Sequence, residues 1–262
     1  MVEPPLPLKV TEVVSELPLT GRVALVTGSA TGIGRACALA LARAGCAVAI
    51  NYRTSGEDAA ETVDLCLRER VRAQPFAADV TLPEEVERLW VEITAALGAP
   101  TILVNNVGAF FARPIGETDP GEWRRIVASN LDSAFYCSRA VLPAMRAAGF
   151  GRIVNLASAP AERLAAAPGE GAYTAAKVAL LSLTRTLAAE EAAHGITVNA
   201  VGPGLTDTGH VPEALREELA RNVPLGRLAR PEEVARVVAF LASPASEHIT
   251  GAHVNVGGGW SL

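Results

Sequence analysis

The chain has 262 residues, of which 50% are hydrophobic and 19% are charged, and its formal net charge is −5. Such a chain can bury one large core, but it lacks the basic surface that nucleic acid or an anionic membrane would require. Its four cysteines form no CxxC pair and lie far from the histidines, which argues against a zinc site and a disulfide scaffold. We therefore expect a small-molecule ligand and no metal.

Residues 1–20 are predicted to be an N-terminal extension, and residues 21–262 a single domain. The extension contains several prolines but no continuous apolar region, and no apolar run reaches the roughly 18 residues of a membrane span. A protein of the reducing cytoplasm is expected.

Short apolar runs alternate with amphipathic helices along the domain. Because the strands are continuous apolar runs, they predict a parallel sheet that is buried on both faces. The fold class is therefore α/β, a single-domain Rossmann-type doubly wound parallel sheet of about seven strands with helices on both faces. Strands are predicted at 23–26, 47–50, 75–77, 102–104, 152–156, 196–200 and 253–256, and helices from the glycine loop to about 44 and at 57–70, 83–97, 120–148, 171–193 and 231–242.

Ligands of such sheets bind outside the carboxyl ends of the strands, so the loops that follow strands are expected to carry the chemistry. One irregular insertion, over residues 206–228 with a short helix at 213–221, is long enough to act as a lid.

A glycine-rich loop follows the first strand directly, with the sequence Thr27-Gly28-Ser29-Ala30-Thr31-Gly32-Ile33-Gly34. Gly28 permits the turn, Gly32 lets the backbone approach a pyrophosphate at the helix N-terminus, and Gly34 allows close packing of helix on strand. We expect a dinucleotide here, bound by Gly28, Thr31, Gly32, Ile33 and Gly34.

The end of the second strand predicts which dinucleotide binds. NAD-preferring enzymes usually place an acid there, but this chain has no acid between Asn51 and Ser55. Arg53 offers a planar, permanently charged group for a 2′-phosphate, and Thr54 or Ser55 can donate to it. NADP(H) is therefore preferred and NAD(H) remains possible; the alternative is that Arg53 is an ordinary surface charge.

With this TGxxxGxG loop, the sequence resembles the short-chain dehydrogenase/reductase family over essentially everything from Gly21 onward. The resemblance implies that Asp79 and Val80, after the third strand, meet the adenine. It also implies cofactor contacts from the turn Asn105-Asn106-Val107-Gly108, namely from Asn106 and Gly108. This turn matches the family's NNAG with a larger Val in place of Ala.

A second part of the nicotinamide site is implied after the sixth strand. Pro203-Gly204 resembles the family's PG turn beside the nicotinamide carboxamide. Thr208 fits the threonine that often follows four residues after this glycine, with Thr206 as the competitor.

The candidate catalytic pair is Tyr173 and Lys177, at the start of an Ala-rich helix. A spacing of four places both on one helical face. Reduction of a carbonyl needs a proton donor at the oxygen, and a tyrosine with a pKa near 10 is a poor base at neutral pH. We expect the Lys177 ammonium and the charge of the oxidised nicotinamide to lower that pKa. Lys177 is also expected to bind the nicotinamide ribose, so both residues belong to the cofactor site as well.

Two further residues complete the implied catalytic set. Ser158, at the end of the fifth strand, stands where the family has its substrate-orienting hydroxyl and is expected to donate to the substrate oxygen. Asn130 matches the family asparagine that holds a water connecting Lys177 with solvent, and the alternative is a helix residue that binds nearby backbone. The loop between Ser158 and Tyr173 contains Glu162 and Arg163, which either contact substrate or are solvated charges.

Several phrases, including the ending Thr250–Gly259, are similar to those of 3-oxoacyl-carrier-protein reductases. Such enzymes tend to present basic residues to an acidic carrier protein, whereas this chain has Gly149-Phe150 and Ala193-His194 in the corresponding stretches. Reductases of another ketone, sugar or pteridine therefore stay open. A non-catalytic NADP(H)-sensing subunit is the remaining alternative, and the complete catalytic set argues against it.

A homotetramer is expected because the apolar residues of the helices 120–148 and 171–193 exceed what one sheet-facing surface needs. Related enzymes pair these two helices into a four-helix bundle and pair again through the last helix and strand. The stripe Val234, Val237, Val238 and Leu241, with residues 257–262, fits the second contact. The alternative is that these side chains fill the core of one chain.

Overall fold

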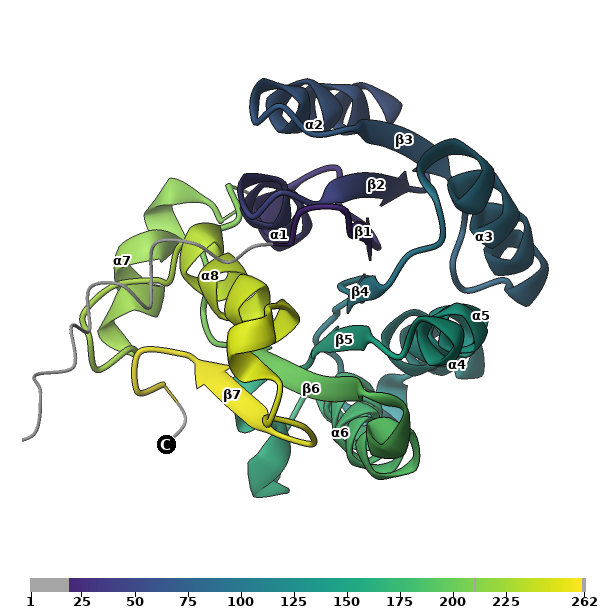
Figure 1. The fold of residues 1–262 in the computed structure, drawn as a ribbon. Coiled ribbons are helices and arrows are strands. Elements are labelled where there is room, and N and C mark those ends of the chain that lie inside the picture. Colours follow the sequence, from purple (N-terminus) through teal and green to yellow (C-terminus); the bar gives the residue numbers. More distant parts are fainter. Residues whose placement is uncertain (1–18, 210, 261–262) are drawn as a thin grey trace, which may run out of the picture.

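In the computed structural model, which describes residues 19–209 and 211–260, seven parallel strands form one sheet (Figure 1). Their order is β3-β2-β1-β4-β5-β6-β7, which confirms the predicted doubly wound topology. Most of the expected N-terminal extension lies outside the described residues. The strands are β1 (Val23–Val26), β2 (Ala47–Tyr52), β3 (Ala73–Ala77), β4 (Ile102–Asn105), β5 (Gly151–Leu156), β6 (Ile196–Pro203) and β7 (His253–Val256).

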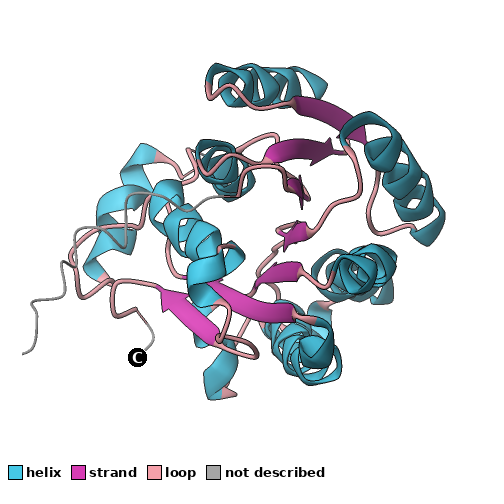
Figure 2. Ribbon diagram, viewed as in Figure 1, coloured by secondary structure: helices cyan, strands magenta, loops and turns pink. Residues whose placement is uncertain are grey.

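Helices cover both faces of the sheet, as Figure 2 shows. On one face lie α1 (Gly32–Arg43), α2 (Gly56–Arg68) and α8 (Pro231–Ala242), and on the other lie α3 (Pro83–Leu97), α5 (Ser133–Ala148) and α6 (Gly171–Glu191). A short helix, α7 (Glu213–Arg221), stands in the insertion after β6. No helix in the described ranges is both long and apolar enough to cross a bilayer.

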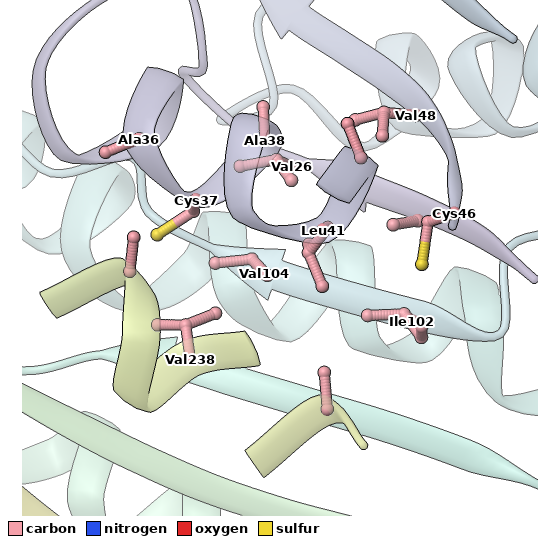
Figure 3. Packing of buried hydrophobic residues seen from close by; sticks show 14 of the residues in the cluster. Val26, Ala36, Cys37, Ala38, Leu41, Cys46, Val48, Ile102, Val104 and Val238 are labelled. Carbon is pink, nitrogen blue, oxygen red and sulfur yellow. The ribbon is translucent and has the colours of Figure 1, made fainter. Parts of the chain in front are cut away.

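The larger core cluster lies between the sheet and the helices α1 and α8 (Figure 3). Val104 and Ile102 of β4 are fully buried in the same cluster as Leu41 of α1, and Val238 of α8 packs into this cluster as well. Small residues of α1, among them Ala36 and Cys37, belong to the same cluster as α8. Each large aliphatic side chain buried here contributes about 1.5–3 kcal/mol, so the sheet is a rigid support for the loops at its edge.

The helix predicted over 120–148 has the expected bounds, but it contains a π-helical turn that the sequence analysis did not predict. A capped helix α4 (Pro120–Val127) is followed by a π-helical turn (Ala128–Asp132) and then by α5. In this turn the Asn130 side chain donates to Ile126 O at 3.0 Å, and the Ser133 hydroxyl donates to Ser129 O at 2.7 Å. Both side chains compete with backbone N–H groups for i−4 carbonyls, which gives a physical reason for the altered turn.

The apolar stripe predicted for a second subunit contact is largely internal. Val234, Val238 and Leu241 are at most 1% exposed and pack into the core with α1. On α5 the exposed large apolar side chain is Phe135, at 46%. The alternative that these residues fill the core of one chain is therefore correct for most of the α8 stripe.

Candidate active site

The glycine loop begins at the carboxyl end of β1, beside the point where the strand order reverses between β1 and β4. Gly28 and Gly32 have φ values of +59° and +57°, which favour glycine. A Cβ at Gly34 would lie 2.4 Å from Gly28 O and 2.6 Å from Asn106 Nδ2, so no side chain fits there. Thr31 is the N-cap of α1 but accepts no capping hydrogen bond through its side chain. The first N–H groups of α1 therefore face the loop.

Two buried or half-buried asparagines hold this loop. Asn106 Nδ2 donates to Thr27 O and Gly28 O, both at 3.0 Å. Asn51, which is 1% exposed, accepts from Gly28 N at 3.2 Å and donates to Ala78 O at 3.1 Å. The amide of Asn51 thus connects the ends of β1, β2 and β3. This role of Asn51 was not predicted from the sequence, although a polar residue at the end of a buried apolar strand is a usable signal.

A cavity of about 380 Å³ opens beside the loop. Its lining includes eight of the residues predicted to bind the cofactor: Gly28, Thr31, Arg53, Thr54, Asp79, Val80, Asn106 and Gly108. The remaining predicted residues lie outside its lining, namely Gly32, Ile33, Gly34, Pro203, Gly204 and Thr208, as do Tyr173 and Lys177.

Arg53 forms an ion pair at the rim of this cavity. Its side chain is 68% exposed, and Nη1 lies 3.3 Å from Asp79 Oδ2. The other carboxylate oxygen of Asp79 accepts from the Thr81 backbone N–H at 3.0 Å and from its hydroxyl at 2.7 Å. Burial alone would raise the pKa of Asp79, but the hydrogen bonds from Thr81 and Arg53 together hold it below its usual value.

The segment after β6 reaches the glycine loop through one threonine. The Cβ of Thr208 lies 3.5 Å from where a Cβ of Gly32 would stand. Thr206, its competitor, donates to Gly204 O at 3.0 Å and so stabilises its own turn. Gly204 packs on Gly257, because a Cβ at Gly204 would lie 2.6 Å from the Gly257 Cα. The structure therefore favours Thr208 over Thr206 as the neighbour of the loop.

Tyr173 and Lys177 lie in the first turns of α6, as their spacing predicted. Lys177 is 4% exposed, donates from Nζ to Leu156 O at 2.6 Å, and has its Nζ 5.6 Å from the centre of the Tyr173 ring. Burial lowers the pKa of Lys177 to about 7. Burial also raises the pKa of Tyr173 to about 12, the charge of Glu170 raises it further, and a hydrogen bond with Ser158 opposes both effects.

For the protein groups alone, burial determines the direction of the Tyr173 pKa shift. The expected lowering by the Lys177 ammonium together with the oxidised nicotinamide stays a prediction. A desolvated lysine with a pKa near neutrality carries only part of a charge at neutral pH, and its ammonium is directed at the Leu156 carbonyl. Tyr173 is consequently protonated at neutral pH.

Asn130 and Gly108 adjoin this pair. Asn130 Nδ2 donates to Ala109 O at 2.8 Å, while Asn130 Oδ1 is buried and accepts no hydrogen bond from the described part of the chain. A Cβ at Gly108 would lie 2.4 Å from that oxygen and 3.3 Å from Lys177 Nζ. Gly108 thus lies between the two side chains and connects the cavity with the catalytic pair.

Glu162 is not directed at the catalytic groups. Its carboxylate forms an ion pair with Arg185 of α6, and its Oε2 lies 3.3 Å from Nδ1 of His253 on β7. The structure therefore favours a role for Glu162 in joining the loop after β5 to α6 and β7.

Comparisons with known proteins identify the family of the chain. A family model described as enoyl-(acyl carrier protein) reductase matches residues 28–261. The chain is 42% identical to 3-oxoacyl-[acyl-carrier-protein] reductase of Pseudomonas aeruginosa, over 92% of this chain and 98% of the relative. The chain belongs to the short-chain dehydrogenase/reductase family. Membership makes it an oxidoreductase that acts on the CH–OH/C=O pair.

Other relatives of the family extend the comparison. Cis-4-hydroxycyclohexanecarboxylate dehydrogenase of Sinomonas cyclohexanicum is 41% identical, over 92% of this chain and 96% of the relative. Among solved structures, a short-chain type dehydrogenase/reductase from Mycobacterium marinum is similar with a TM-score of 0.88 and 33% identity. That comparison covers 94% of this chain and 98% of the other.

Proposed function

We propose that the chain is an NADP(H)-dependent oxidoreductase that transfers hydride between nicotinamide and a carbonyl or alcohol substrate, with Tyr173 as general acid and base. The observation that carries this proposal is the convergence of Tyr173, Ser158, Lys177 and Asn130 beside the glycine-loop cavity. Gly108 belongs to the cavity and to the catalytic group, since it lines the cavity and adjoins Asn130 and Lys177.

The residues of the cavity fit a dinucleotide. The glycine loop would hold the pyrophosphate through backbone N–H groups, and Asp79 with Val80 would meet the adenine. Asn106, Gly108, Pro203, Gly204 and Thr208 would surround the nicotinamide side. When bound, such a cofactor supplies or accepts a hydride, and its oxidised ring is a cation.

The protein groups by themselves are prepared for carbonyl reduction. Tyr173, with its pKa raised to about 12, holds a proton that it can donate to a carbonyl oxygen. Ser158 hydrogen-bonds Tyr173 and would donate to the same oxygen, which stabilises developing negative charge. Lys177, with its pKa lowered to about 7 and its Nζ 5.6 Å from the centre of the Tyr173 ring, would exchange protons near neutral pH and help to restore the proton of Tyr173.

The preference for NADP(H) is supported by Arg53. Its exposed guanidinium lies at the cavity rim with Thr54, and its pairing with Asp79 restricts its position. A 2′-phosphate at this rim would accept a charge-assisted hydrogen bond from Arg53. The 2′-hydroxyl of NAD(H) is uncharged and would gain less from the same guanidinium.

The substrate is proposed from the relatives. Their names refer to a 3-oxoacyl group on a carrier protein, a hydroxycyclohexanecarboxylate and D-β-hydroxybutyrate. A 3-oxoacyl compound is therefore the first candidate, and reduction of another ketone, a sugar or a pteridine is the second. Following nicotinamide absorbance while the purified protein is mixed with NADPH and a panel of carbonyl compounds tests the proposal. Cofactor binding without turnover on any compound would favour the sensing subunit instead.

A homotetramer remains part of the proposal, with α5 and α6 as the first contact. A groove of about 650 Å³ runs along the outer face of α6 beside Val178 and Arg185. A second groove, of about 420 Å³, lies along α5 beside Ala140 and Pro143. Light scattering should give the mass of four chains, and a mass near 27.2 kDa would reject any assembly.

A further inference from the structure

Two adjacent phenylalanines follow the turn Asn105–Gly108 and face different surroundings. Phe111 packs against the buried cluster of Ile126, Ala172 and Ala176. Phe110 is 57% exposed, and its ring stands at 90° to the ring of Tyr173, with 5.2 Å between the ring centres. Phe110 therefore covers one side of the candidate catalytic tyrosine while much of its own ring stays uncovered.

Packing within the chain does not account for this exposed ring. An edge-to-face aromatic contact stabilises by about 0.5–1.5 kcal/mol, whereas a phenylalanine gains more when it is fully buried. Phe110 also follows Gly108 by two positions, and Gly108 adjoins Asn130 Oδ1 and Lys177 Nζ. The uncovered ring thus belongs to the wall of the reaction site rather than to a remote surface.

A second exposed apolar side chain of the same loop lies against the start of α6. Ile115, which is 59% exposed, lies directly over Gly171, where a Cβ would be 2.7 Å from the Ile115 Cδ1. The backbone N–H of Arg113 donates to Gly169 O at 2.6 Å and joins the loop after β4 to the segment before α6. The guanidinium of Arg113 is paired with Glu122 at 3.1 Å.

We propose that Phe110, with Ile115 from the same loop, determines substrate specificity by selecting carbonyl compounds whose carbon skeleton is aliphatic or alicyclic and uncharged. The exposed ring gains from covering CH groups next to the carbonyl, whereas hydroxyl groups placed against it would lose hydrogen bonds to water without replacement. The negative charge near Tyr173, from Glu170, further disfavours an anionic substituent on this side. The inference rests on the proposed function and names the substrate class of that site.

The test compares cyclohexanone with dihydroxyacetone as substrates for reduction by NADPH. Phe110→Ala should lower kcat/KM for cyclohexanone roughly 10- to 100-fold, while dihydroxyacetone changes less than about threefold. Phe110→Leu should recover most of the loss. Val91→Ala, which shortens a 65% exposed side chain on α3, is the matched control and should leave both values unchanged.

Three outcomes would overturn the proposal. The first is an equal loss of kcat/KM for both ketones in Phe110→Ala, which would mean that Phe110 only supports Tyr173. The others are an unchanged kcat/KM for cyclohexanone in this variant and a wild-type preference for dihydroxyacetone. If the wild type reduces neither ketone, the specificity claim is tested by binding instead, and the proposed function fails only if no compound of the wider carbonyl panel is turned over. Saturation-transfer NMR of cyclohexanone with the NADP⁺-loaded protein then decides the specificity claim. Saturation transfer to cyclohexanone that is lost in Phe110→Ala but kept in Val91→Ala supports the proposal. Saturation transfer that is absent in the wild type, or unchanged in Phe110→Ala, overturns it.

Discussion

The half of the site around β1 and β2 and the half around β5 and α6 are built on different principles. In the first half, recognition rests on backbone N–H groups, amide braces such as Asn51 and an Arg53 side chain that is 68% exposed. In the second half, a buried lysine and a half-buried tyrosine have pKa values that move in opposite directions, to about 12 for Tyr173 and about 7 for Lys177.

The difference shows how each task determines its surroundings. A dinucleotide is bound by many weak, well-aligned contacts, for which close backbone approach matters more than burial of charge. Proton transfer needs a few groups whose affinity for a proton has been changed, and removal from water is what changes it. Substitutions in the second half should therefore affect turnover and pH dependence, and those in the first half cofactor affinity.

The largest effect is expected from Tyr173→Phe. Loss of the hydroxyl should lower turnover by about 10²- to 10⁴-fold, because it removes the general acid. Binding of NADPH, measured by fluorescence titration, should stay within about twofold. Tyr136→Phe on α5 serves as the control, and a Tyr173 variant that keeps turnover within about threefold of wild type would contradict the assignment.

A second prediction concerns pH. Between about pH 7 and 10.5 the unfolded chain binds a proton at Lys177 that the folded chain does not, so the free energy of unfolding should fall as the pH is lowered through this window. Lys177→Met should remove this dependence, and the difference in free energy of unfolding between the two proteins should change by about 5 kcal/mol across the window. Urea unfolding at several pH values measures it. Parallel curves for wild type and variant would show that Lys177 keeps its ordinary pKa. The same variant should also lose turnover and cofactor affinity.

In the cofactor half, Gly34→Ala should be the most damaging single methyl group. The added carbon would lie 2.4 Å from Gly28 O, so helix and loop must separate, at a cost of about 1–3 kcal/mol in stability. NADPH affinity should fall more than tenfold. Gly116→Ala, where nothing lies within 4 Å of the new carbon, should change neither property. Equal stability and equal NADPH affinity of the two variants would contradict the close approach of α1 to the glycine loop at Gly34.

The smallest effect is expected from Arg53→Ala, which should weaken NADPH about tenfold and NADH hardly at all, since only the 2′-phosphate receives the charge-assisted contact. The loss should shrink at high salt, because this arginine is exposed. Arg43→Ala removes another exposed arginine, 62% accessible and paired with Glu69, and should affect neither cofactor. If Arg53→Ala weakened both cofactors alike, Arg53 would not read the phosphate.

The sequence by itself determined the order of strands and helices, the glycine loop and the placement of Tyr173 and Lys177 on one helical face. These features depend on local periodicity and spacing, which a single chain displays directly. The roles of Gly28 and Gly34 were predictable from their positions in the loop, although the atoms that exclude a side chain there include those of the distant Asn106.

Only the tertiary structure decided the features that depend on burial and on contacts between distant segments. The Asn51 brace joins residues 23 and 27 positions apart, and the Arg53–Asp79 pair spans 26. The direction of the Tyr173 and Lys177 pKa shifts follows from desolvation, which no spacing reveals. The π-helical turn at Asn130 likewise arises where side chains take backbone acceptors, and whether Phe110 or Phe111 turns inward is settled by the pocket that receives one of them.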